Sequence, residues 1–119
     1  IVPYLYFPKL PEGMKRFDDI WSGIIFKRIA DLFGWPVTCG RPLVLHERAS
    51  NPLNNLKQEM LGYGINEELW KLVDDAPRNW TTPLAYYLAI AAHLYGRWLE
   101  FRSVSANMQV WASLFEEEG

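Results

Sequence analysis

Apolar residues recur every three or four positions in five stretches of the chain, which is the spacing of one helix face. The helices predicted from this spacing span residues 18–33, 52–61, 67–73, 83–101 and 106–117. Local start signals support them, with Asp18 and Asn66 as N-caps and Pro52 and Pro83 in first turns. Gly34 is a typical stop signal for the first helix. The second half of the chain is therefore predicted to be entirely helical.

Extended segments are predicted only in the first half. Residues 2–7 form an aromatic-rich run that Pro8 ends, residues 37–39 are a weaker candidate, and residues 43–46 form an apolar run after a turn. Two or three short strands with about five helices predict an α/β fold, or α+β for the chain taken alone. Because a complete parallel sheet needs more strands, the sheet is expected to have partners outside this sequence.

The size and charge of the chain limit its class. Its 119 residues, half of them hydrophobic, suit a single domain or part of one, with residues 77–119 as a helical tail. A net charge of -2 gives no electrostatic footprint for nucleic acid. The longest apolar run, residues 84–95, is shorter than the ~20 residues of a membrane span. A soluble, cytoplasmic protein is expected, and the start at Ile1 suggests a piece of something longer.

Two polar clusters carry the candidate chemistry. Asp18 and Asp19 at a helix start could accept a proton or hold a substrate hydroxyl, although aspartate is also an ordinary N-cap. Trp21 could form an aromatic wall of a site or belong to the core. The second cluster lies nearly thirty positions later, at the end of the predicted strand 43–46.

This second cluster mixes metal-binding and anion-binding side chains. His46 is a candidate metal ligand and Arg48 a candidate phosphate ligand, although one histidine alone does not make a metal site. Ser50 and Asn51 could bind a ligand or cap the helix that Pro52 starts. The sequence contains no nucleophile elbow, phosphate loop, dinucleotide fingerprint or HExxH motif.

The order of the two clusters resembles a known family. RFDDIWSG, followed by an apolar helix and GRPLVLHERASNPLNNLKQE, resembles the C-terminal part of the reversibly glycosylated polypeptides, the UDP-arabinopyranose mutases. The matching residues are Asp18, Asp19, Trp21, Gly23, His46, Arg48, Ala49, Ser50, Asn51, Pro52, Asn55, Leu56, Lys57 and Glu59.

The resemblance implies a glycosyltransferase A type fold that acts on a UDP-sugar with a divalent metal, usually manganese. Asp18 and Asp19 would be catalytic and contact sugar hydroxyls or the acceptor. Trp21 would support the wall of the substrate site beside them. His46 would complete the metal coordination. Arg48 and Lys57 would face phosphate oxygens, and the substrate-binding set also includes Ser50 and Asn51.

The same resemblance also sets limits. The family places its nucleotide-binding strands, its Asp-x-Asp metal motif and its glycosylated arginine in an N-terminal half that has no counterpart here. Family members most often carry lysine where this chain has Arg48, which changes the geometry of a phosphate contact. The chain alone is therefore expected to be inactive.

Two hypotheses follow. In the first, the chain is the acceptor-side, metal-completing part of a mutase-like glycosyltransferase, located in the cytoplasm or at the periphery of the Golgi. It would function with a missing N-terminal half or as a homo-oligomer, and His46 would lie within about 15 Å of at least one of the Asp18 and Asp19 carboxylates. In the second, the chain is a non-catalytic helical module for protein–protein interaction, with a closed core and an apolar surface for a partner.

Overall fold

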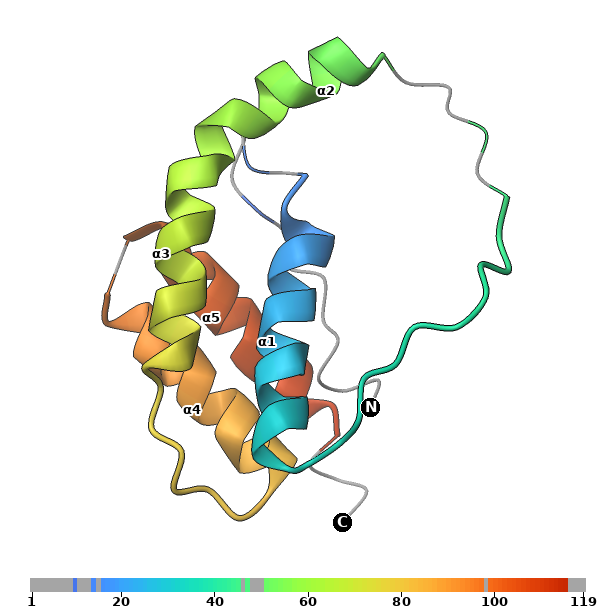
Figure 1. Ribbon diagram of the computed structural model, residues 1–119. Coiled ribbons are helices and arrows are strands. Elements are labelled where there is room, and N and C mark those ends of the chain that lie inside the picture. The colour runs from blue at the N-terminus through green and yellow to red at the C-terminus, as the bar shows by residue number, and fades with distance from the viewer. Residues whose placement is uncertain are drawn as a thin grey trace.

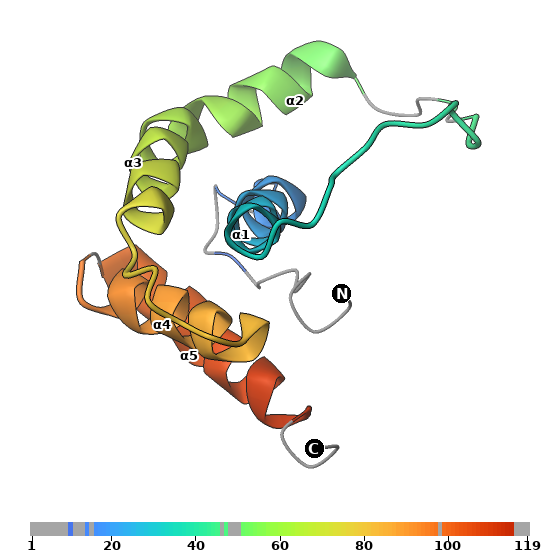
Figure 2. The same cartoon turned by 60° about the horizontal axis from the view of Figure 1, so that its bottom comes forward.

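A computed structural model describes residues 10, 14, 16–45, 47, 51–97 and 99–115, without the side chains of Leu61 and Glu100. Its elements, in chain order, are α1 (Asp18–Leu32), α2 (Pro52–Glu59), the 3₁₀ turn η2 (Met60–Gly62), α3 (Tyr63–Asp74), α4 (Pro83–Tyr95) and α5 (Leu99–Ser113). Figures 1 and 2 show α1 beside α3, with the α4–α5 pair packed behind them and α2 extending away from this bundle. None of the described helices combines the length and apolar character needed to cross a membrane.

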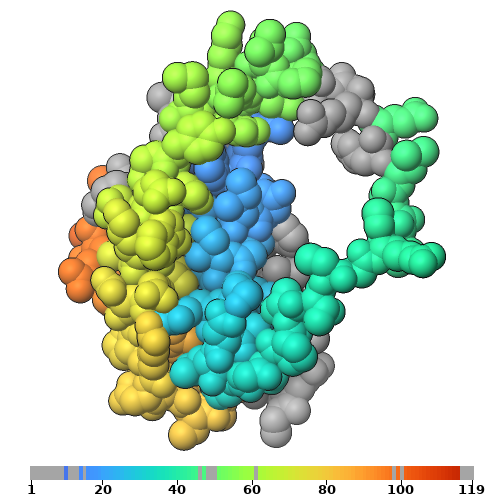
Figure 3. All heavy atoms as spheres, viewed as in Figure 1, coloured from blue at the N-terminus to red at the C-terminus, as the bar shows by residue number. Residues whose placement is uncertain are grey.

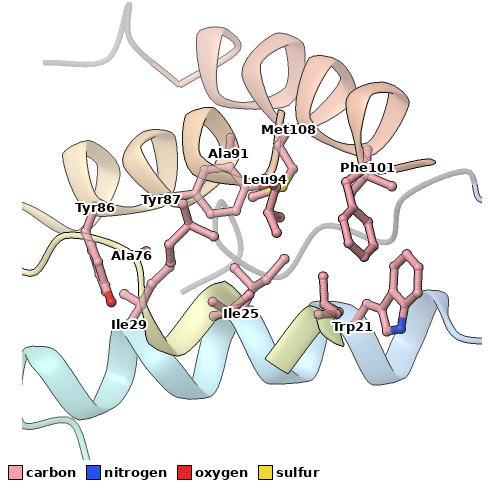
Figure 4. Packing of buried hydrophobic residues seen from close by; sticks show 14 of the residues in the cluster. Trp21, Ile25, Ile29, Ala76, Tyr86, Tyr87, Ala91, Leu94, Phe101 and Met108 are labelled. Atoms are coloured by element: carbon pink, nitrogen blue, oxygen red, sulfur yellow. The ribbon is translucent and has the colours of Figure 1, made fainter. Parts of the chain in front are cut away.

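One face of α1 forms the centre of the core. Trp21, Ile25 and Ile29 follow one another at four-residue spacing and are fully or almost fully buried. They face side chains from α4 and α5, as Figure 4 shows, while α3 contributes Leu69 and Val73 to the same cluster. The core therefore joins four helices: α1, α3 and α4 contact one another, and α4 also packs against α5.

The α4–α5 pair is the most extensive helix contact of the described chain. It is fixed by apolar burial and by one buried hydrogen bond, in which the Ser105 hydroxyl donates to the carbonyl of Ala91 at 2.6 Å. A hydrogen bond that satisfies a buried hydroxyl avoids the cost of leaving that group unpaired. Ser105 therefore fixes the register between the two helices.

Local signals placed several helix ends correctly. Thr82 caps α4, since its hydroxyl accepts from the backbone N–H of Ala85, and Asn51 caps α2 through the N–H of Leu53. Gly34 ends α1 with a left-handed φ of +67°. Its conformation brings the N–H of Trp35 to the carbonyl of Ala30 at 2.8 Å.

The predicted N-cap of α1, Asp18, is wrong by one residue. Phe17 is the N-cap, without a capping side chain, and Asp18 and Asp19 both lie in the first helical turn. Two carboxylates at this position still interact favourably with the positive end of the helix dipole. Charge in the first turn, rather than a capping hydrogen bond, therefore explains their helix-starting effect.

The predicted break after residue 61 is also wrong, because α2, η2 and α3 follow one another without a loop. Gly62 keeps a right-handed φ of -88°, and Asn66 lies inside α3 rather than at its cap. A Cβ built on Gly62 would lie 2.0 Å from the Phe17 ring. Glycine is needed here for close packing, and the sequence does not distinguish that need from a helix stop.

The boundary between the last two helices differs from the prediction as well. α4 ends at Tyr95, before Gly96, instead of near residue 101, and α5 already begins at Leu99. Phe101 and Val104 are buried on α5, so the apolar period continues across the turn. Because the helical spacing of apolar residues continues through the short connection between the two helices, the sequence pattern does not show where α4 ends and α5 begins.

The predicted α/β class is wrong: the described residues form five helices and no strand. Residues 37–39 and 43–45 have no secondary structure, and Leu43, Val44 and Leu45 are 95%, 81% and 91% exposed. The third predicted strand, residues 2–7, lies outside the described part. An apolar run predicts burial, but a strand also needs a partner for its backbone groups, and residues 37–45 meet none within the described chain.

The two helix caps are expected to differ in their effect on stability. Thr82→Ala removes the cap of a core helix and should lower the free energy of unfolding by about 1 kcal/mol. Asn51→Ala removes the cap of α2, which buries no residue, so it should change that free energy by less than about 0.5 kcal/mol. Urea unfolding followed by circular dichroism measures both values, and equal losses would contradict the peripheral role of α2.

Candidate functional site

The two predicted catalytic carboxylates lie at the N-terminal end of α1. Asp18 is half-buried and Asp19 is exposed, and one Asp19 carboxylate oxygen accepts from the N–H of Ile20 at 2.8 Å. The Ser22 hydroxyl donates to the backbone carbonyl of Asp19, which steadies the first turn. The remaining lone pairs of Asp19 can accept from a ligand. The catalytic role of the pair remains a prediction.

Trp21 lies in the core. Its ring is fully buried, with its centroid 5.4 Å from the Phe101 ring in an edge-to-face arrangement and 6.3 Å from the Phe17 ring. The indole N–H is buried and has no hydrogen-bond partner among the described residues. In this arrangement Trp21 positions the start of α1 by packing, and direct substrate contact remains a prediction.

The second polar cluster is only partly described. His46, Arg48 and Ser50 lie outside the described residues, so their distance from Asp18 and Asp19 stays untested. Asn51 and Lys57 are described and exposed, and the Asn51 side chain accepts the 3.0 Å capping bond from the N–H of Leu53. Within the described ranges, no group of three or more His, Cys, Asp or Glu side chains could hold a metal ion.

A groove between α1 and α3 was not predicted from the sequence. It has a volume of about 390 Å³ and is lined on the α1 side by Ile20, Gly23 and Ile24 and on the α3 side by Trp70 and Val73. Figure 3 shows the two helices side by side on the same face of the molecule. We refer to it below as the α1–α3 groove. A glycine inside a helix, where it is unfavourable, was the available sequence signal.

Two ion pairs line the C-terminal end of this groove. Lys27 pairs with Asp31 within α1, and the guanidinium of Arg28 reaches a carboxylate oxygen of Asp74 on α3 at 2.9 Å. The Arg28 guanidinium also donates to the backbone carbonyl of Asp74 at 3.1 Å. Arg28 therefore joins the two walls of the groove.

A second hollow, of about 500 Å³, lies between α4 and the segment before it. Trp80, Leu88 and His93 are among its lining residues, and His93 is half-buried. Burial lowers the pKa of His93 below its ordinary value of 6.5 and the positive charge of Arg97 lowers it further, while Asp75 opposes the shift. The neutral imidazole is therefore favoured in the folded protein.

This lowered pKa makes stability depend on pH. Below about pH 6.5 the unfolded chain binds a proton at residue 93 more readily than the folded chain does. The free energy of unfolding should therefore fall as the pH drops through 6.5, until the folded pKa is reached. His93→Gln should remove this part of the pH dependence of the unfolding free energy, as measured by urea unfolding between about pH 5 and pH 8. An unchanged pH dependence in the variant would contradict this assignment.

Truncation should cost far more stability at the tryptophan of α1 than at the tryptophan of α3. Trp21→Ala leaves a large cavity in the core and should cost about 3–5 kcal/mol of unfolding free energy. Trp70→Ala removes a ring that is 44% exposed and should cost less than about 1 kcal/mol. Denaturant unfolding measures both, and similar costs would show that the burial pattern of α1 and α3 is wrong.

Comparisons with known proteins extend over almost the whole chain. The family model described as reversibly glycosylated polypeptide matches residues 1–118. UDP-arabinopyranose mutase 3 of Arabidopsis thaliana is 32% identical over 98% of this chain and 34% of its own length. Probable UDP-arabinopyranose mutase 2 of Solanum tuberosum is 30% identical over the same shares, and probable UDP-arabinopyranose mutase 1 of Pisum sativum is 41% identical over 58% of this chain and 20% of its own length.

This chain therefore spans about a third of the length of the first two of these relatives. No solved structure matches it. The predicted family resemblance is confirmed by both kinds of match.

Proposed function

This chain belongs to the reversibly glycosylated polypeptide family, and from this we propose that it is the C-terminal, acceptor-side part of a UDP-sugar-dependent, UDP-arabinopyranose mutase-like protein. The observation that carries the proposal is the similarity to two named mutases over 98% of this chain. None of the relatives compared above favours a non-catalytic interaction module.

The start of α1 is the catalytic edge in this proposal. Trp21 anchors the first turn in the core, and Asp18 and Asp19 precede it with carboxylates that retain access to solvent. A fixed carboxylate can orient a sugar hydroxyl and accept its proton, whereas a carboxylate on an unsupported loop would lose that orientation. The core position of Trp21 supports this role for its neighbours.

The substrate-binding residues of the proposal are Arg48, Ser50, Asn51 and Lys57. Arginine and lysine would pair with phosphate oxygens of the UDP group, and the small polar side chains would donate hydrogen bonds. Lys57 is exposed on α2, which leaves its ammonium free to meet a ligand. The exposure of Leu43 to Leu45 supports a further polypeptide surface that covers this segment in the working protein.

The predicted manganese ion does not fit the described residues alone. Asp18 and Asp19 are adjacent carboxylates, and no third metal-ligating side chain joins them in the described part of the chain. Manganese binding therefore depends on His46 and on ligands supplied from outside this chain. When bound, a divalent metal would neutralise charge on the diphosphate leaving group.

A longer protein that contains this chain and has a nucleotide-binding half tests the catalytic assignment. Asp18→Asn and Asp19→Asn each keep the shape of the side chain but remove its charge, and at least one should lower turnover of UDP-arabinopyranose by about 10²–10⁴-fold. Glu68→Gln, on α3 outside the groove and the α1 start, should leave turnover unchanged. Full turnover in both Asp variants would remove these residues from the catalytic assignment.

Isothermal titration calorimetry tests whether binding of UDP and manganese requires residues outside the 119-residue chain. UDP with manganese should give no heat of binding to the 119-residue chain and a saturable heat with the longer protein. Binding of equal affinity to the 119-residue chain would contradict the proposed dependence on ligands from elsewhere.

A further inference from the structure

The floor of the α1–α3 groove is open at Gly23. A Cβ built on this residue would meet no atom within 4 Å, whereas a Cβ on Gly62 would collide with the Phe17 ring. Packing therefore explains the glycine at position 62 but not the one at position 23. Glycine in the middle of a helix is unfavourable relative to alanine, and Gly23 has an ordinary negative φ. What its missing side chain provides is free space in the groove.

A fixed aromatic ring borders this space. The indole N–H of Trp70 donates to a carboxylate oxygen of Glu67 at 3.0 Å, which limits rotation of the ring. Ile20, on the opposite wall, is 45% exposed although it is a large apolar residue. Glycine, isoleucine and indole together give an apolar surface that is open to solvent.

Every charge at the charged end of the groove has an oppositely charged partner. Lys27 pairs with Asp31 along α1, and Arg28 pairs with Asp74 across the groove. Arg78, which does not line the groove, approaches the same Asp74 carboxylate at 3.6 Å. Three positive groups beside two carboxylates offer no net attraction to a metal cation. The rim does offer both donors and acceptors, since a paired carboxylate keeps further lone pairs. A neutral ligand rich in hydroxyl groups fits this rim.

We propose that the α1–α3 groove binds one sugar ring, with the apolar face of the ring against Trp70 and its hydroxyls toward the charged rim. The volume of about 390 Å³ lies within the range of small-molecule sites. Asp19 stands one helical turn before Gly23 and so lies toward the same side of α1. The inference rests on the proposed function, in which Asp19 contacts a sugar hydroxyl. The groove would hold a sugar ring of the acceptor beside the catalytic edge.

Nuclear magnetic resonance of the ¹⁵N-labelled chain tests the proposal with L-arabinose and D-galactose as probes. We expect the indole N–H signal of Trp70 to shift and to saturate at millimolar sugar, as a small neutral ligand in an open groove allows. Trp70→Ala and Gly23→Ala should each weaken binding by about tenfold, through loss of the stacking face and through filling of the floor. Gly23→Ala should at the same time raise the thermal midpoint, because alanine favours the helix.

Two matched variants serve as controls. Trp80→Ala removes a tryptophan of similar exposure, 40%, that lines the other hollow, and Gly64→Ala changes a glycine of α3 whose added Cβ also meets no atom. Both should bind sugar as the unchanged chain does. Binding of uridine in place of the sugars, absence of a Trp70 shift, or equal loss in the control variants would overturn the proposal.

The outcome is independent of catalysis, because free sugars require neither nucleotide nor metal. If the sugars shift Trp70 but Asp18→Asn and Asp19→Asn leave turnover intact in the longer protein, the groove stands and the catalytic assignment fails. If turnover depends on those carboxylates but the sugars leave Trp70 unchanged, the groove proposal alone fails.

Discussion

The packing of Trp21 between Phe17 and Phe101 is the contact on which the other parts of the structure depend. It joins the start of α1 to α5, and Ile25 and Ile29 continue the same buried face along α1. A buried aromatic side chain removes roughly 150–250 Å² from water, worth about 4–6 kcal/mol at 25 cal/mol per Å² as an upper bound. For a domain of this size, that is a large share of the total stability.

The same helix serves two purposes on its two sides. The side that carries Trp21 is committed to the core, so the side that carries Ile20 and Gly23 is left to form the α1–α3 groove. The carboxylates of Asp18 and Asp19 precede both sides. Large-to-small substitutions on the Trp21 side of α1 are therefore expected to cost more stability than those on the side that borders the groove.

Local chemistry in the sequence predicted the helices better than their connections. Thr82 and Asn51 act through hydrogen bonds within three residues, so their capping could be predicted without tertiary structure. Gly62 acts through contact with Phe17, forty-five positions away, and no local rule distinguishes that packing from a helix stop. The apolar run of Leu43 to Leu45 predicted a strand, but pairing depends on a second segment that the run does not specify. The groove could not be predicted either, because it forms only where α1 and α3 pack together and local sequence does not specify that contact.

Native-state hydrogen exchange of the 119-residue chain tests most directly whether α1 is the central element of the fold. Amides between Trp21 and Ala30 should exchange as slowly as those of α4 and α5, through global unfolding, because their helix is held by the shared core. Amides of α2, which buries no side chain, should exchange by local opening and orders of magnitude faster. Exchange in α1 as fast as in α2 would contradict the account, because the proposed catalytic residues and the groove would then lack a fixed support.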